Sequence, residues 1–490
     1  MKYLLLAVYA AMLVVIALYT AKRNKTLNDF FLGGRNMGAW MSAFAYGTSY
    51  FSAVIFIGYA GKIGWGFGLA AVWIGIGNAL IGSLLAWLVL GKRTRVITHR
   101  LNVATMPDFF EKRFNSRGLK ILSAIIIFLF LVPYSASVYQ GLSYLFEEVF
   151  NIPFLYCILG MAILTGVYLV IGGYLATAIS DFVQGTIMLI GIVMVIFFVV
   201  RSPEVGGLSE GLSRLAQIDG KLVSASGPPG WAQLLSLVFL TSLGSWGLPQ
   251  MLHKFYAIRD EQAIRRGTVI STLFAIAVAG GAYFIGVFGR LFLSGVPVDP
   301  ATGAANFDMI MPQVLATALN NVDALIGIVV VLVLSASMST LSSLVLVSSS
   351  AISMDLVSGI MMPGMGEKKV HALMRILCGV FVVLSVMLAV FKLSTIVTLM
   401  SLSWGTISGA FLGPFVWGLY MKRATRAGAW AGMLAGLGTS IALNLFAPEM
   451  GAPMAGCFAM AASLVVTPLV SLVTKPLPAI TVKPVLEKVS

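Results

Sequence analysis

The residues that first suggest chemistry are hydroxyl side chains crowded into an apolar segment. Residues 332–351 read LVLSASMSTLSSLVLVSSSA, with five serines and a threonine between positions 335 and 343. On a helix, one broad face would collect Ser335, Ser339, Ser342 and Ser343, with Thr340 at its margin. Serines in membrane helices often bond the carbonyl one turn back or a neighbouring helix, which accounts for one or two of them. Their concentration at mid-depth favours a small hard cation such as Na⁺, which needs several oxygen ligands.

Asp181 is the acidic residue, of 18, that we place inside an apolar segment rather than in a loop or at an edge. A carboxylate at the middle of a membrane costs roughly 2.5–3.5 kcal/mol on insertion scales, so such a group usually faces a cavity or a cation. The alternative is a helix cap, because Ser180-Asp181 suits the start of a helix. The cost of burial favours the cation-linked role.

The composition indicates which elements must carry these groups. The chain has 490 residues, of which 59% are hydrophobic and only 10% charged, whereas soluble domains carry roughly 25% charged residues. Apolar runs of about 20 residues, the length that crosses a bilayer, recur from end to end. We therefore predict an all-α polytopic membrane protein. The first run, 3–20, is expected to be a retained helix, because AKRNK follows it instead of a small-residue cleavage site.

We expect about thirteen transmembrane helices, at roughly 3–20, 38–61, 68–91, 119–142, 153–172, 178–200, 231–253, 268–291, 323–352, 374–391, 395–420, 428–447 and 453–474. Basic residues, which give the net charge of +14, concentrate after the odd-numbered spans, and Lys254 is among them. The positive-inside rule therefore selects an N-out/C-in orientation. The basic character reflects topology and does not indicate nucleic acid. The cytoplasmic segment 102–114 is expected to form a short amphipathic helix with its phenylalanines inward.

Two spans have interrupted, glycine- and hydroxyl-rich middles: AYGTSYFSA at 45–53 and TSLGSWGLPQ at 241–250. They lie five spans apart, so each begins one of two corresponding halves. A half with an odd number of spans begins and ends on opposite sides of the membrane, so the second half is inverted relative to the first. Such breaks in inverted halves indicate a midplane binding site in a secondary transporter, although glycine and proline are also frequent in ordinary membrane helices. The expected organisation is a first helix and loop (1–37), two repeats (38–200 and 231–420), two further helices (421–474) and a cytoplasmic tail (475–490).

Several kinds of chemistry are missing from the sequence. The three histidines, His99, His253 and His371, fall at or beyond cytoplasmic span ends, so no histidine-centred relay or triad can form at mid-membrane. HExxH and P-loop motifs are absent. The three scattered cysteines suggest neither a disulfide nor a metal site. We predict that the protein is not an enzyme.

Five blocks of the sequence resemble the sodium:solute symporter family, in family order and over nearly the whole chain. The most specific is GLYMKRATRAGAWAGMLAGLG; the others are FFLGGRNMGAW, IGGYLATAISDFVQG, GLPQMLHKF and MSTLSS. The resemblance implies a LeuT-like fold with five-plus-five inverted repeats. It also implies a principal sodium site made by the carbonyls of Thr48, Phe51 and Ala336 and the hydroxyls of Ser339 and Thr340. Some members hold a second sodium, at positions matched here by Asp181, Ser342 and Ser343.

The proline/pantothenate-type branch is the most similar, but this chain departs from proline carriers. Those carriers have an acidic residue where this chain has Tyr50 and a tryptophan where it has Val54, whereas pantothenate carriers share the tyrosine. These departures put proline specificity in doubt, and the expected solute is a small carboxylate-bearing compound, such as a monocarboxylate, a pantothenate-like compound or an amino acid. Candidate solute-binding residues are Tyr50, Ser52, Tyr134, Ser137, Thr241, Ser245 and Trp246. For Tyr134, a tyrosine of the interfacial belt is an equal alternative.

The predicted function is sodium-coupled symport of a small organic solute by alternating access, with sodium as the co-transported ion. The expected location is the plasma membrane, specifically a bacterial inner membrane, with no nucleic acid and no obligate protein partner. The alternative is a transport-silent sensor or a pore of the same fold. A sensor of this fold would usually carry a cytoplasmic signalling domain, and the tail after the last span has only about sixteen residues. A pore would not need inverted broken helices.

Overall fold

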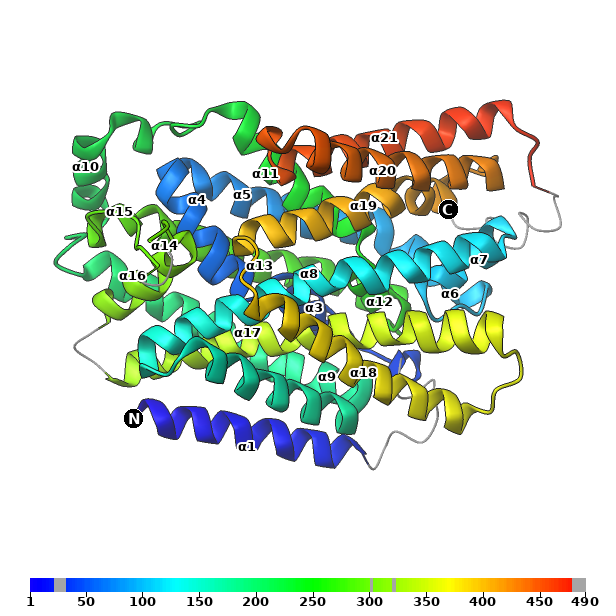
Figure 1. The fold of residues 1–490 in the computed structure, drawn as a ribbon, viewed down its shortest axis with the longest axis horizontal. Helices are drawn as coiled ribbons and strands as arrows, with labels where there is room; N and C mark the ends of the chain where they lie inside the picture. The colour runs from blue at the N-terminus through cyan, green and yellow to red at the C-terminus, as the bar shows by residue number, and fades with distance from the viewer. Residues whose placement is uncertain (22–31, 300–302, 320–322, 478–490) are drawn as a thin grey trace.

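The computed structural model describes residues 1–21, 32–299, 303–319 and 323–477. Parts of two expected units, the first cytoplasmic loop at 22–31 and the tail from 478 onward, lie outside these ranges. In the described residues the fold is helical, with two isolated bridges, Met37–Ile258 and Val298–Ala305. The long helices run side by side across the molecule, with α1 (Lys2–Ala21) along one edge and α20 (Arg426–Phe446) and α21 (Ala452–Val473) along the opposite edge (Figure 1).

The other α-helices are α3 (Ala39–Tyr50), α4 (Ala60–Phe67), α5 (Val72–Gly77), α6 (Lys92–Arg100), α7 (Met106–Phe114), α8 (Arg117–Phe150), α9 (Phe154–Arg201), α10 (Leu208–Ile218), α11 (Trp231–Leu243), α12 (Pro249–Tyr256), α13 (Glu261–Ala275), α14 (Gly281–Val287), α15 (Gly289–Phe292), α16 (Ile310–Ala318), α17 (Asp323–Ser350), α18 (Glu367–Val390) and α19 (Ile396–Tyr420). Short 3₁₀ or π segments are η1 (Gly33–Arg35), η2 (Val54–Tyr59), η3 (Gly68–Ala71), η4 (Asn78–Leu85), η5 (Trp87–Gly91), η6 (Gly220–Val223), η7 (Gly244–Gly247), η8 (Ile276–Gly280), η9 (Phe307–Met309), η10 (Ala351–Met361) and η11 (Pro448–Met450).

Within the described ranges, nine helices are long and apolar enough to cross a membrane, or ten if the bent pair α11–α12 is one span. Shorter apolar helices cover Lys2–Ile16 and Phe154–Val167. The helices cover the apolar segments expected from the sequence, so the all-α prediction is confirmed. The number of crossings and the orientation stay predictions.

Both expected helix breaks are present. Helix α3 ends at Tyr50, and Phe51 has extended backbone angles of φ −113° and ψ 114° before the chain re-enters a helix. In the second half, Leu248 is extended at φ −84° and ψ 123°, and the axis bends by 46° between 231–247 and α12. Pro249 begins α12, where its missing N–H group costs nothing.

Gly68 ends the first broken span and separates it from the next. Its φ of +56° is a conformation that side-chain-bearing residues rarely adopt, and a Cβ there would overlap the carbonyl oxygen of Leu222. The chain therefore turns at Gly68 between α4 and η3, at the boundary expected between the second and third spans.

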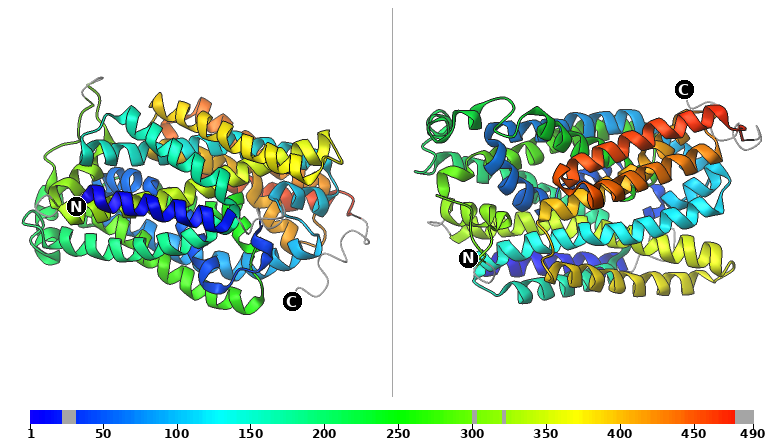
Figure 2. Two further views of the ribbon diagram at one scale, coloured as in Figure 1. Left: turned by 90° about the horizontal axis from the view of Figure 1, so that it is seen from below. Right: turned by 45° about the horizontal axis from the view of Figure 1, so that its top comes forward.

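Helix α17, which carries the hydroxyl cluster, lies in the interior and packs on α3, α8 and α9. A membrane helix with many hydroxyl groups is more stable against other helices, which offer hydrogen-bond partners, than against lipid, which accounts for this position. Small residues bring α19, α20 and α21 together at the other edge, seen in the tilted view of Figure 2. A Cβ on Gly409 would lie 2.7 Å from the Cβ of Ala459, so the helix backbones approach closely there.

The amphipathic helix expected within 102–114 is present as α7, which begins only at Met106. Its N-cap is Thr105, whose hydroxyl accepts from the Asp108 N–H at 3.2 Å, and Phe109, Phe110 and Phe114 are fully buried. Arg113 is also buried and donates from Nε to the Gly418 carbonyl at 2.7 Å, which satisfies an orphan carbonyl at the end of α19.

The expectation that Asp181 alone among the acidic residues lies inside a span is wrong. The π-helical segment η10 extends the span of α17 to Met361 and includes Asp355. The Asp355 side chain is buried there, at 2% exposure. Its carboxylate accepts from Thr105 Oγ1 at 2.7 Å and lies 3.8 Å from Lys120 Nζ. Hydropathy alone could not place Asp355, because the lysine that compensates it lies on a distant helix, α8. Asp308, in η9, is also buried at 3% exposure.

Candidate functional site

The C-terminal end of α3 meets the hydroxyl cluster of α17. The break at Phe51 leaves the last carbonyls of α3 without intrahelical donors, so they are open to outside partners. The Thr340 hydroxyl lies 3.2 Å from the Thr48 carbonyl and 3.1 Å from the Ala336 carbonyl. Ser339 Oγ lies 2.8 Å from Thr48 Oγ1. The structure therefore brings together four of the five residues predicted for the principal sodium site.

Phe51, the fifth residue, lies at the break itself and is fully buried, with its ring stacked on Tyr50 at 4.4 Å between centroids. Its carbonyl as a sodium ligand stays a prediction. Ser337 was not among the predicted site residues. Its hydroxyl accepts from the Ala53 N–H at 3.1 Å and donates to the Val333 carbonyl at 2.7 Å. Ser337 thus satisfies a backbone donor that the break exposes.

Asp181 is fully buried in the middle of α9, so the helix-cap alternative is wrong. Its Oδ1 accepts from Ser339 Oγ at 2.5 Å, and its Oδ2 lies 3.5 Å from the ammonium of Lys254. The carboxylate is therefore adjacent to the predicted principal site and already faces one cation.

The prediction that Lys254 lies in a cytoplasmic connection between spans is wrong. The residue lies in α12, its side chain is 2% exposed, and Nζ donates to Ser343 Oγ at 3.0 Å. Helix α12 continues to Tyr256 and turns this side chain inward onto Asp181, because a buried carboxylate requires a compensating charge. The need of a buried carboxylate for a positive partner was the one feature of the sequence that could have assigned Lys254 to the interior.

The two serines predicted for the second sodium behave differently. Ser343 Oγ lies 2.9 Å from Ser49 Oγ on α3 and takes part in the Lys254 contact. Ser342 Oγ donates to the Met338 carbonyl one turn back, at 2.6 Å. The structure therefore places Ser343 beside Asp181 through the shared lysine and shows Ser342 engaged with its own helix.

Tyr50 and Thr241 join the two broken spans. The Tyr50 hydroxyl donates to the Thr241 carbonyl at 2.5 Å. Asn78 of η4, which the sequence analysis missed, accepts at Oδ1 from Thr241 Oγ1 at 2.8 Å and from Ser242 Oγ at 3.1 Å. This polar group lies between the two halves, where the breaks predict a solute.

Ser245 and Trp246 lie close to this group but bind η4. Ser245 Oγ donates to the Ser242 carbonyl at 2.8 Å and lies 3.4 Å from the Gly82 carbonyl. Trp246 Nε1 donates to the Ile81 carbonyl at 3.0 Å. Both side chains thus connect η7 to η4.

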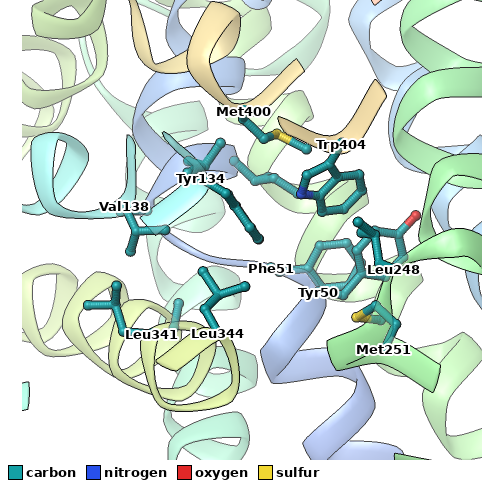
Figure 3. Close-up of a cluster of buried hydrophobic side chains, with 14 of the residues drawn as sticks. Tyr50, Phe51, Tyr134, Val138, Leu248, Met251, Leu341, Leu344, Met400 and Trp404 are labelled. Atoms are coloured by element: carbon teal, nitrogen blue, oxygen red, sulfur yellow. The ribbon is translucent and has the colours of Figure 1, made fainter. Parts of the chain in front are cut away.

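Tyr134 is 1% exposed, so the interfacial-belt alternative is wrong. Its ring meets the edge of Trp404 at 5.6 Å, and Trp404 stacks on Tyr50 at 5.9 Å. Figure 3 shows these rings and Phe51 converging from three helical segments. Trp404, which the sequence analysis missed, is thus the aromatic partner shared by two predicted solute residues.

The remaining two candidates differ in their partners. Ser52 Oγ accepts from the Val54 N–H at 3.3 Å, within the break, and its hydroxyl also lies beside the Tyr134 side chain. Ser137 Oγ donates to the Tyr134 carbonyl at 2.6 Å, within α8. The structure does not bring Ser137 to the Tyr50–Thr241 group by any recorded hydrogen bond.

Freed carbonyls beside intrahelical hydroxyls, at the centre of a bundle with two broken helices, are typical of ion-coupled secondary transporters. Comparison with known proteins gives the family within this class. Residues 30–436 match the sodium:solute symporter family, and the chain belongs to it. The protein is therefore a membrane transporter with sodium as co-transported ion, and not an enzyme.

Individual relatives agree with this assignment. The chain is similar to a sodium/proline symporter of Staphylococcus aureus (strain bovine RF122 / ET3-1), at 31% identity over 89% of this chain and 84% of the relative. The corresponding protein of strain JH9 is 30% identical over the same shares.

Two solved structures show the same fold. A Na⁺-coupled sialic acid symporter in a substrate-bound outward-open state matches with a TM-score of 0.80 at 17% identity, over 97% of this chain and 98% of that chain. A nucleobase-cation-symport-1 family transporter in a closed conformation matches with a TM-score of 0.57 at 13% identity, over 93% and 97%. The predicted LeuT-like fold class agrees with these neighbours.

Proposed function

We propose that the protein symports Na⁺ with a small carboxylate-bearing solute by alternating access across a bacterial inner membrane. The observation that carries the proposal is the position of the Thr340 hydroxyl, 3.2 Å from the Thr48 carbonyl and 3.1 Å from the Ala336 carbonyl. Two backbone oxygens and a hydroxyl from two different helices converge there, and hard cations select oxygen ligands.

The principal sodium ligands in this proposal are the carbonyls of Thr48, Phe51 and Ala336 and the hydroxyls of Ser339 and Thr340. These groups are neutral, so the ion brings a net positive charge into the bundle. The Asp181 carboxylate, 2.5 Å from Ser339 Oγ, lies close enough to offset part of that charge.

A second sodium at Asp181, Ser342 and Ser343 is part of the proposal and requires two rearrangements. Ser342 must turn its hydroxyl away from the Met338 carbonyl, and the Lys254 ammonium must leave Asp181. With two sodium ions per singly charged anion, or per neutral solute, each turnover would carry net positive charge inward.

The proposed solute pocket is formed by Tyr50, Ser52, Tyr134, Ser137, Thr241, Ser245 and Trp246. The N-terminal ends of the resumed helices provide a positive dipole end that suits a carboxylate. The relatives named sodium/proline symporters support an amino acid among the candidates. Because Tyr50 and Val54 differ from the residues of proline carriers, a monocarboxylate and a pantothenate-like compound are candidates alongside an amino acid.

The function is tested with purified protein in liposomes, with an inward sodium gradient and a panel of radiolabelled amino acids, monocarboxylates and pantothenate. We expect one solute class to accumulate with sodium and not with potassium. Sodium leak without any solute dependence would favour a pore, and binding without uptake would favour a sensor. Cysteine labelling from each side would test the proposed thirteen spans, the inverted repeats and the N-out/C-in orientation.

A further inference from the structure

Lys254 occupies the place where the proposed second sodium would bind. Its ammonium lies 3.0 Å from Ser343 Oγ and 3.5 Å from Asp181 Oδ2, and these are two of the three residues proposed to hold that ion. Ser343 Oγ lies in turn 2.9 Å from Ser49 Oγ at the end of α3. The cation position is therefore connected by hydroxyl groups to the broken helix that carries the principal site.

The Lys254 ammonium and a sodium ion cannot both lie beside Asp181 without a large electrostatic cost. Both the lysine and the aspartate are almost completely buried, at 2% and 0% side-chain exposure, so water screens little of their charge. One carboxylate compensates one positive charge, and a second cation beside the ammonium would meet strong like-charge repulsion. Sodium and ammonium must therefore exclude each other at Asp181.

The lysine lies on the short helix that follows the break of its span. It lies in the last turns of α12, six residues after the extended Leu248 where the axis bends by 46°. Asp181, by contrast, lies within the continuous helix α9. The four-carbon stem of lysine allows its ammonium to withdraw when α12 shifts or when sodium arrives.

We propose that Lys254 is a tethered competitor of sodium, so that its ammonium and a sodium ion occupy the position at Asp181 in alternation. The inference rests on the proposed second cation position of a sodium-coupled carrier. In the sodium-free carrier the ammonium balances the buried carboxylate, which would otherwise be costly. Sodium binding then requires release of Lys254, which links occupancy of this position to the placement of α12.

The test measures equilibrium binding of ²²Na⁺ to purified full-length protein in detergent, without solute. Lys254→Met removes the competitor, so we expect the sodium concentration for half-saturation to fall by about tenfold or more, with additional sodium bound per protein. Lys254→Arg keeps the charge and should remain close to the wild type. Lys369→Met, which removes an exposed lysine of α18, is the matched control and should change nothing.

Asp181→Asn combined with Lys254→Met should lose the gain, because the carboxylate that attracts the additional sodium is gone. If Lys254→Met does not fold, Lys254→Gln keeps a hydrogen-bonding side chain without charge and carries the same expectation. Wild-type or weaker sodium binding in the folded uncharged variant would overturn the proposal, provided that Thr340→Ala still weakens binding in that background. Failure of Thr340→Ala to weaken binding would instead count against the proposed principal site.

Discussion

The hydroxyl of Ser339 donates a 2.5 Å hydrogen bond to the Asp181 carboxylate while it lies 2.8 Å from Thr48 Oγ1. One side chain of α17 therefore contacts both the broken helix α3 and the continuous helix α9. This hydroxyl is a proposed ligand of the principal sodium and contacts the carboxylate proposed for the second, so occupancy of one position should influence the other.

Thr340→Ala and Ser339→Ala should each raise the sodium concentration for half-maximal uptake by about tenfold or more, which corresponds to roughly 1.4 kcal/mol per lost ligand. Phe51→Leu should matter less, because Phe51 is proposed to bind through its backbone. Sodium-dependent uptake in liposomes measures the effect. Ser385→Ala is the control, since that hydroxyl bonds the Phe381 carbonyl within α18. Unchanged sodium dependence in the Ser339/Thr340 double variant would show that the assignment is wrong.

Asp181→Asn should lower the sodium Hill coefficient of uptake toward one, because it keeps the shape of the side chain and removes the charge. A carrier with two sodium ions per neutral or singly charged solute should also respond to voltage, with about 2.3 kcal/mol of drive per 100 mV for each net charge. Flux-ratio measurements on the wild type give the number of sodium ions transported per solute. A ratio of one sodium per solute would end the case for a second transported sodium.

Tyr134→Phe and Ser245→Ala should weaken solute affinity with little change in sodium affinity, since neither hydroxyl belongs to the proposed sodium sites. Ser137→Ala should have a smaller effect, because that hydroxyl is engaged by the Tyr134 carbonyl. Competition of unlabelled solute against labelled uptake gives the affinities. If the first two variants both keep wild-type affinity, the pocket lies elsewhere.

Gly436→Ala should destabilise the packing of α20 on α19. A Cβ at Gly436 would overlap the backbone carbonyl oxygen of Gly409, which cannot yield as a flexible side chain would. Overpacking of this kind costs about 1–3 kcal/mol, so the thermal midpoint of the detergent-solubilised protein should fall. Gly438→Ala, on the same helix, meets no atom within 4 Å and should leave the midpoint nearly unchanged. Equal midpoints for the two variants would contradict the close approach seen here.

The sequence by itself determined the features that depend on local chemistry. Glycine, proline and hydroxyl residues marked both breaks, because they decide locally whether a helix continues. Apolar length predicted where the helices lie, since hydrocarbon demands internally satisfied backbone. The hydroxyl run of α17 and the isolated Asp181 pointed to a cation site because polar groups at that depth need a partner.

Only the tertiary structure decided which partners those groups have. Lys254 and Asp181 are 73 residues apart in sequence, and Ser339 and Thr48 are 291 apart. Such pairs form because α9, α12 and α17 pack around α3, and no local pattern records that packing. Asn78 and Trp404 were missed for the same reason, and Lys254 was assigned to a loop because charge alone suggested solvent. The electrostatic partner of a buried charge is a property of the fold, since residues from distant segments must be brought within a few ångströms to compensate it.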